Sequence, residues 1–364
     1  MPAKKLIAPF YERLALILIG FCILGYLVIL AKDLVDPLIF GFLFAVLLLP
    51  ISNFLERKCR LPRSASSFIS VILFVGFVAA IMYLVGTQLS NLSNDWPMLL
   101  SQIKQSLQNV QEWIQGAFHI TASKQLVYVE DTGRKIMASG TAVLGTTFGA
   151  ISSLVLFYIF ILIFTFFILF YRRLLLRFAI SVFNDDNSNV VMDIVENAQK
   201  ILRQYIFGLL LEMVIVAGVS ITVFYIIGIK YAALLGILVG LFNIIPYLGI
   251  FTALLLSTLI TFATGTLSET ITVALSVVGI HAVDANLLLP AVVGSKVRLN
   301  ALITFIGIIL GEMLWGLSGM FLSIPIIAIF KIIFDRVETL KPWGYLLGGD
   351  YEYKEEAQEK MKTE

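Results

Sequence analysis

Residues 231–264 read YAALLGILVGLFNIIPYLGIFTALLLSTLITFAT, and this uncharged run decides the fold. About 20 apolar residues are enough to cross the roughly 30 Å hydrocarbon core of a membrane. The run is longer than that, but it breaks at NIIPYLG, residues 243–249, where the proline removes a backbone donor. The arm on each side has about 15 residues, or about 22 Å as a helix, which is short for a full crossing. We therefore expect a re-entrant helical hairpin whose turn lies inside the membrane.

The composition excludes a soluble protein. Hydrophobic residues make up 59% of the 364 residues and charged residues only 14%, whereas soluble domains are about 45–50% apolar and about 25% charged. A net charge of +2 provides no strong field for nucleic acid. The two cysteines, Cys22 and Cys59, fit neither a disulfide framework nor a metal site. These features predict a polytopic membrane protein that contacts the lipid bilayer and binds neither nucleic acid nor a structural metal.

Hydropathy predicts an all-α fold with about eight membrane helical elements. The last element breaks again near Gly316–Gly319 and is expected to form a second hairpin. The eight elements are residues 14–31, 37–55, 68–89, 148–171, 204–229, 231–264, 270–290 and 301–334. The predicted regions are N-terminal spans (1–89), a small outward-facing helical insert (90–140), a fourth span (141–171), a cytoplasmic amphipathic helix (172–203), a transport core (204–334) and a cytoplasmic tail (335–364).

The distribution of lysine and arginine predicts the orientation. With the elements placed as above, 20 of these residues fall on one face of the membrane and 6 on the other. Cytoplasmic loops collect basic residues. Both termini are therefore expected in the cytoplasm, whether each hairpin is re-entrant or crosses twice.

The C-terminal half looks duplicated. An offset of 72 residues places Glu212 on Asp284, and an offset of 71 places the pair Gly236/Gly240 on Gly307/Gly311. The two units would have opposite orientations in the membrane. Inverted repeats with broken helices are typical of secondary transporters, in which a ligand site forms where the breaks meet. The alternative is coincidence, since small residues abound in membrane helices.

Three carboxylates fall within predicted membrane segments: Glu212, Asp284 and Glu312. A charged side chain at a helix centre costs roughly 2.5–3.5 kcal/mol on insertion scales, so such residues are usually functional or paired. A structural alternative stays open for each of them. In the structural alternative, Glu212 is a protonated carboxyl that makes only a hydrogen bond. Asp284 forms an ion pair with Lys296 or Arg298, and Glu312 faces water near the hairpin tip.

Helix breaks supply further candidates, because their free backbone groups can coordinate a cation or a polyol. The predicted substrate or ion pathway comprises the three carboxylates together with Asn243, Pro246, Tyr247, Gly249, Asn286, Pro290, Gly316 and Gly319. The alternative is that these turns serve folding alone. His281 lies one turn before Asp284; an imidazole can carry protons, but a lone histidine beside an acid is more often structural.

Enzyme motifs are absent from the sequence, including Gly-x-Ser-x-Gly, His-Glu-x-x-His and the Gly-Lys-Ser/Thr phosphate loop. We therefore expect no catalytic residue, no cofactor and no ATP-driven step within this chain.

Two blocks carry a resemblance to a known family. NIIPYLG at residues 243–249 resembles the Asn-x-x-Pro-Tyr-x-Gly signature of the autoinducer-2 exporter family, and DANLLLPAVVG at 284–294 resembles its acidic-x-Asn…Pro…Gly block. Residues 299–301 depart from it, because they read Leu-Asn-Ala where many relatives have His-Pro. Residues similar to those of the family's last hairpin are Gly311, Gly316, Gly319, Pro325 and Lys331.

The resemblance implies a permease of the bacterial plasma (inner) membrane that exports autoinducer-2, with some members acting as sodium or lithium/proton antiporters. It also implies a homo-oligomer, with a pentamer as the suggested form. Three hypotheses follow: an exporter of a small polar solute, a monovalent cation/proton antiporter, and a membrane scaffold that binds a partner through the outward insert.

Overall fold

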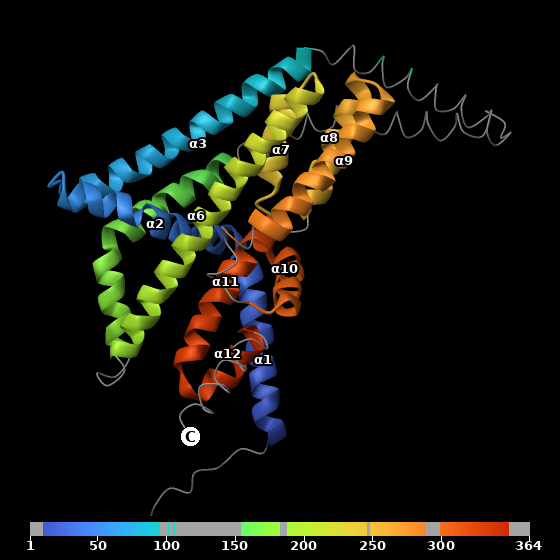
Figure 1. Cartoon of the computed structure of the whole chain (residues 1–364). Helices are drawn as coiled ribbons and strands as arrows, with labels where there is room; N and C mark the ends of the chain where they lie inside the picture. Colours follow the sequence, from blue (N-terminus) through green and yellow to red (C-terminus); the bar gives the residue numbers. More distant parts are fainter. Residues whose placement is uncertain are drawn as a thin grey trace, which may run out of the picture.

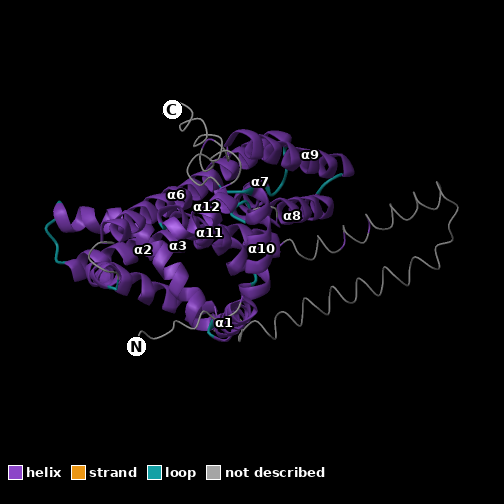
Figure 2. Ribbon diagram, turned by 90° about the horizontal axis from the view of Figure 1, so that it is seen from below, coloured by secondary structure: helices purple, strands orange, loops and turns teal. Residues whose placement is uncertain are grey.

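The computed structural model in Figure 1 describes residues 10–94, 101, 105, 154–182, 188–245, 248–288, 291 and 299–348. All regular structure among these residues is helical, and none of them forms a strand (Figure 2). Six helices are long and apolar enough to cross a membrane, and four shorter apolar helices accompany them in the described part. The prediction of an all-α polytopic membrane protein is confirmed.

The N-terminal half of the described chain forms four long helices. They are α1 (Phe10–Leu30), α2 (Lys32–Arg57), α3 (Arg63–Asn94) and the helix Leu154–Ser181. Buried apolar side chains join α2, α3 and this fourth helix in one cluster. At one end of the cluster, Glu56 forms ion pairs with Arg63, Arg172 and Arg173. Most of the predicted insert lies outside the described residues.

The helix α6 (Ser188–Ile227) is the central element, with 40 residues. The sequence suggested two elements here, a cytoplasmic helix ending at residue 203 and a membrane span starting at residue 204. The structure joins them into one helix, because neither proline nor glycine stands at residues 200–207, where the amphipathic part meets the more apolar part.

The first hairpin consists of α7 (Ala232–Phe242) and α8 (Leu248–Thr264). Its first arm lies so close to α6 that a methyl group added at Gly240 would be 2.6 Å from the carbonyl oxygen of Met213. Such a distance leaves no room for a side chain, so Gly236 and Gly240 are packing residues. A capping box at Thr266 and Glu269 then starts α9 (Leu267–Val283), which continues as a short π-helix, η2 (Asp284–Leu288).

The second hairpin consists of α10 (Ala301–Trp315) and α11 (Leu317–Arg336), which are followed by η4 (Glu338–Leu340) and α12 (Lys341–Gly348). Gly316 forms the turn with a φ of 65°, a conformation that glycine adopts without strain. The predicted extent of the break, from Gly316 to Gly319, is wrong. The arm α11 has 20 residues and is long enough to cross a membrane, because the helix resumes directly after Gly316 instead of after Gly319.

The two hairpins pack onto successive stretches of α6. Leu202 and Leu209 belong to one buried cluster with Trp315 and Leu322 of the second hairpin, whereas Val216 and Phe224 belong to another cluster with residues of the first. In Figure 1 the first hairpin occupies the upper half of the molecule and the second the lower half, with α6 running through both. Each turn therefore lies beside the middle part of α6.

The glycine pairs matched by the sequence offset do not make equivalent contacts. Gly236 and Gly240 face α6, whereas Gly307 and Gly311 face α11, the other arm of their own hairpin. The two hairpins are thus alike in shape, but their first arms pack against different neighbours.

Candidate functional site

A side-chain bridge joins three helical elements where the first hairpin turns. The Nδ2 group of Asn243 donates to Glu212 Oε1 at 3.1 Å and to Asp284 Oδ2 at 3.0 Å. Glu212 comes from the middle of α6, Asn243 from the end of α7, and Asp284 from the junction of α9 and η2. We call these three residues the amide bridge.

The amide bridge is buried and has unused bonding capacity. The side chains of Glu212 and Asp284 are only 3% and 5% exposed. Within the described part of the chain, Glu212 Oε2 and Asp284 Oδ1 accept no hydrogen bond. Buried polar atoms are normally satisfied, and the exceptions are concentrated at sites that take a ligand, an ion or water. The two free oxygens are therefore available to a small molecule or a proton.

His281 belongs to the same neighbourhood. Its ring is buried on α9, one turn before Asp284, and the charge of that carboxylate acts on it. Neither ring nitrogen has a hydrogen-bond partner among the described residues. The sequence favoured a structural role for this histidine, and that interpretation stays a prediction.

Local sequence explains how the bridge forms. Asn243 is the C-cap residue of α7, where the helix ends, and its side chain turns toward α6. Asp284 begins the π-helix, a wider turn that is frequent at functional sites. Asn286 belongs to that π-helix but is exposed, and its amide donates to the carbonyl oxygen of Ala282 at 2.7 Å.

The other predicted residues separate into three groups. Gly316 forms the turn of the second hairpin, whereas Gly249 and Gly319 lie in the first turns of α8 and α11. A methyl group added at Gly249 would be 2.0 Å from the carbonyl oxygen of Phe242. Glu312 is exposed on α10, and no described contact brings it to the amide bridge. Residues outside the described part are Pro246, Tyr247, Pro290, Lys296 and Arg298.

One buried acid was missed by the sequence analysis. Asp36 lies on α2, and the hydroxyl group of Ser318, at the turn of the second hairpin, donates to its carboxylate. The predicted second span began at residue 37, so Asp36 fell outside the predicted membrane segments. The signal available in the sequence was the absence of any helix breaker between Lys32 and Asp36.

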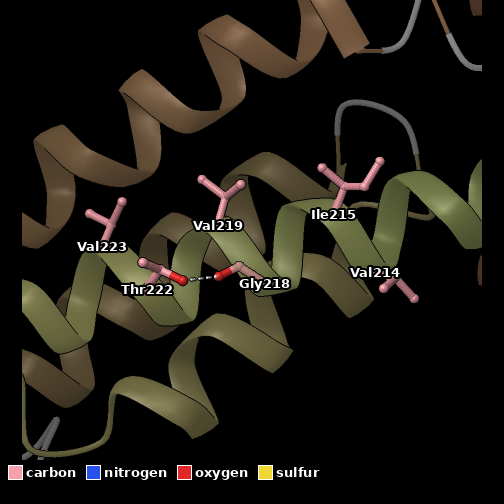
Figure 3. A pocket seen from close by; sticks show the side chains of 6 residues that line it. All are labelled: Val214, Ile215, Gly218, Val219, Thr222 and Val223. Atoms are coloured by element: carbon pink, nitrogen blue, oxygen red, sulfur yellow. Dashed lines mark hydrogen bonds between the residues drawn. The ribbon is translucent and has the colours of Figure 1, made fainter.

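A groove of about 400 Å³ lies on another face of α6. Figure 3 shows its lining, in which the Thr222 hydroxyl donates to the carbonyl oxygen of Gly218 at 2.8 Å. Its lining residues are Val214, Ile215, Gly218, Val219, Thr222 and Val223. They are almost entirely apolar and include no residue of the amide bridge, so this groove suits lipid or an apolar neighbour better than a polar solute.

The chain is similar to a family of transporters and to proteins described as putative transport proteins. The sequence model described as AI-2E family transporter matches residues 14–339. The chain is 26% identical over 329 residues to "Putative transport protein YrrI" of Bacillus subtilis, with 85% of this chain and 88% of that protein covered. It is 24% identical over 331 residues to "Putative transport protein YueF" of the same organism, with 88% and 89% covered. It is 21% identical over 324 residues to "Putative transport protein YhhT" of Escherichia coli, with 87% and 89% covered.

Proposed function

The chain belongs to the AI-2E transporter family, and from that premise we propose that it is a secondary transporter that exports a small polar solute. The sequence contains no nucleotide-binding loop, which favours transport driven by an ion or solute gradient over ATP hydrolysis. The resemblance of the two sequence blocks suggests a solute like autoinducer-2.

The amide bridge is the observation that carries this proposal. Two carboxylates buried in a membrane bundle are costly, and such groups mark substrate or ion pathways. Here both depend on one neutral amide at the end of a broken helix. A displacement of the end of α7 would release both acids at once, which is the behaviour expected of a site that opens alternately to the two sides.

The free atoms of the bridge suit a solute with hydroxyl groups. Carboxylate oxygens accept hydrogen bonds, and Glu212 Oε2 and Asp284 Oδ1 are both unoccupied acceptors in the described part. A hydroxylated solute would donate to these two oxygens, and His281 would donate to or accept from a third group of the same molecule.

A cation/proton antiporter is the second candidate. It is favoured because two carboxylates lie on either side of one amide group. Like charges a few ångströms apart repel, so one bound proton or one monovalent cation stabilises the pair. The described residues contain no group of three or more His, Cys, Asp or Glu side chains placed to hold a metal ion. A transported cation would therefore need backbone carbonyl groups or water as further ligands.

We also propose that the protein lies in the bacterial plasma membrane with both termini in the cytoplasm, as the 20-to-6 division of basic residues supports. Assembly as a homo-oligomer follows from the resemblance, and the many exposed apolar side chains on α1, α3 and α9 are compatible with contacts to lipid or to further copies.

Reconstitution in proteoliposomes tests the proposal. We expect vesicles with the protein to release trapped autoinducer-2 faster than empty vesicles. The antiporter candidate predicts instead that NaCl or LiCl evokes proton movement, seen with a pH-sensitive dye, without any solute release. Absence of both solute flux and cation-evoked proton movement under every imposed gradient would refute transport.

A further inference from the structure

The second hairpin also meets a buried acid, Asp36 of α2. Its side chain is 4% exposed and lies in a helix long and apolar enough to cross a membrane. The Ser318 hydroxyl donates to this carboxylate, but Oδ1 has no hydrogen-bond partner in the part of the chain that the structure describes. A buried carboxylate with one neutral donor is poorly compensated, which marks it for a function beyond packing.

The turn of the second hairpin is held firmly against this part of α2. The rings of Phe40 and Phe321 stack with centroids 5.7 Å apart and an angle of 6° between their planes. Phe40 lies one turn after Asp36, and Phe321 lies nearly one turn after Ser318. The same hydrophobic cluster includes Trp315, with Val35 and Ile39 packed against it. Trp315 and the residues on either side of Asp36 therefore belong to one hydrophobic cluster.

Trp315 supplies the complementary unsatisfied atom. The residue is buried, and its Nε1 group donates to no acceptor among the described residues. An indole N–H can only donate, and an ionised carboxylate oxygen can only accept. A hydroxyl group is the simplest chemical group that satisfies both, because it donates through its hydrogen and accepts through its oxygen.

We propose that Asp36, Trp315 and Ser318 form a second binding site, which takes a hydroxyl group of a polyhydroxylated solute. Asp36 Oδ1 accepts from that hydroxyl, and Trp315 Nε1 donates to it. The proposal deepens the transport function and rests on it, since the solute is the cargo. It places one polar site at the turn of each hairpin: the amide bridge at the first and this site at the second.

A resident water has the same donor and acceptor chemistry, so the experiment must separate water from solute. The intrinsic fluorescence of Trp315 can do so in a full-length variant that keeps it as the sole tryptophan, with Trp96→Phe, Trp113→Phe and Trp343→Phe. Glycerol is the probe, and its trimethyl ether is the control, because ether oxygens accept but cannot donate to Asp36. We expect a saturable change in emission with glycerol and none with the ether.

Variants of α2 test the role of the carboxylate. Asp36→Asn should raise the Kd for glycerol at least tenfold, whereas Asp33→Asn, at an exposed acid three residues earlier in the same helix, should leave it unchanged. If Asp36→Asn does not fold, Ser318→Ala should still weaken binding several-fold. A flat response to glycerol would mean that a resident water holds the site and would overturn the proposal. Equal responses to glycerol and its ether, or equal effects of Asp33→Asn and Asp36→Asn, would overturn it as well.

The outcome is separable from that of the transport assay. Saturable glycerol binding without flux would support this site and count against the proposed transport. Flux without a response of Trp315 would support transport and refute the second site.

Discussion

Asn243 is the residue on which the proposed site depends, because its two amide hydrogens are shared between Glu212 and Asp284. Asn243→Ala removes the amide that donates to both buried carboxyl groups. Losing the partner of a buried polar group costs about 1–3 kcal/mol. We expect Asn243→Ala to lower the thermal unfolding temperature of the detergent-solubilised protein clearly.

The matched control is Asn197→Ala, which removes an exposed amide–carboxylate bond to Asp193 on the same helix α6. Exposed substitutions usually change stability by less than about 0.5 kcal/mol. Equal unfolding temperatures for Asn243→Ala and the wild type would mean that the amide bridge contributes nothing to the fold.

A second-site rescue tests whether the two acids act on each other. In the Asn243→Ala background, Asp284→Asn removes one of the two facing carboxylates, and the new amide can donate to Glu212. Residues in one hydrogen-bonded network show coupling energies of about 0.5–3 kcal/mol. We expect the double variant to unfold at a higher temperature than Asn243→Ala alone.

Asp33→Asn in the same background is the control for the rescue, since Asp33 is exposed and far along the chain from the bridge. A double variant with Asp284→Asn that is less stable than Asn243→Ala would show that repulsion between the acids is not the main cost.

At the scale of single residues, the sequence identified the important acids, but it did not show which side chains bond to one another. Glu212 and Asp284 stand out because a charge in an apolar span is costly. Their joining through Asn243 depends on how α6, α7 and α9 pack, which no local pattern encodes. Asp36 was missed because Lys32, Asp33 and Asp36 look like a polar linker, although α2 already begins at Lys32.

At the scale of the elements, the second hairpin depends on a close crossing of its two arms. A methyl group added at Gly311 would lie 2.3 Å from the carbonyl oxygen of Gly319. Overpacking of this kind typically costs about 1–3 kcal/mol. We expect Gly311→Ala to lower the unfolding temperature, measured in the same detergent as the wild type.

Gly279→Ala on α9 is the matched change, because a methyl group there meets no atom within 4 Å. Alanine is the better helix former by about 1 kcal/mol, so this variant should be as stable as the wild type or slightly more so. If both variants lose the same stability, the crossing at Gly311 is not the cause.

The breaks of both hairpins were predictable, whereas the lengths of the helices were not. Pro246 and the glycines at 316 and 319 mark the turns by their backbone preferences. Ser318 and Gly319 look like part of the second break, yet packing of α11 against α10 and α6 keeps them helical. In the same way, Leu202 and Tyr205 are buried in one cluster on either side of residues 203–204 and hold α6 together there, where polarity alone suggested a boundary.

At the scale of the whole molecule, α6 brings the two hairpins together. Leu209 packs with the second hairpin and Glu212 bonds to the first, and these residues are three positions apart, or about 4.5 Å along the helix. The internal repeat predicted that Glu212 and Asp284 are related, and the structure places them on one amide. The repeat did not predict the contacts of the glycine pairs, because these contacts depend on which helix packs against each arm.

Solute flux through two matched variants of α6 tests the central claim most directly. Glu212→Gln changes the amide bridge, whereas Glu196→Gln makes the same chemical change at an exposed position of the same helix. Both are compared with the wild type in proteoliposomes at equal reconstituted protein, after thermal unfolding confirms that each is folded. Transport through the amide bridge predicts a rate at least tenfold lower for Glu212→Gln and an unchanged rate for Glu196→Gln. A folded Glu212→Gln protein that transports at the wild-type rate would contradict the account.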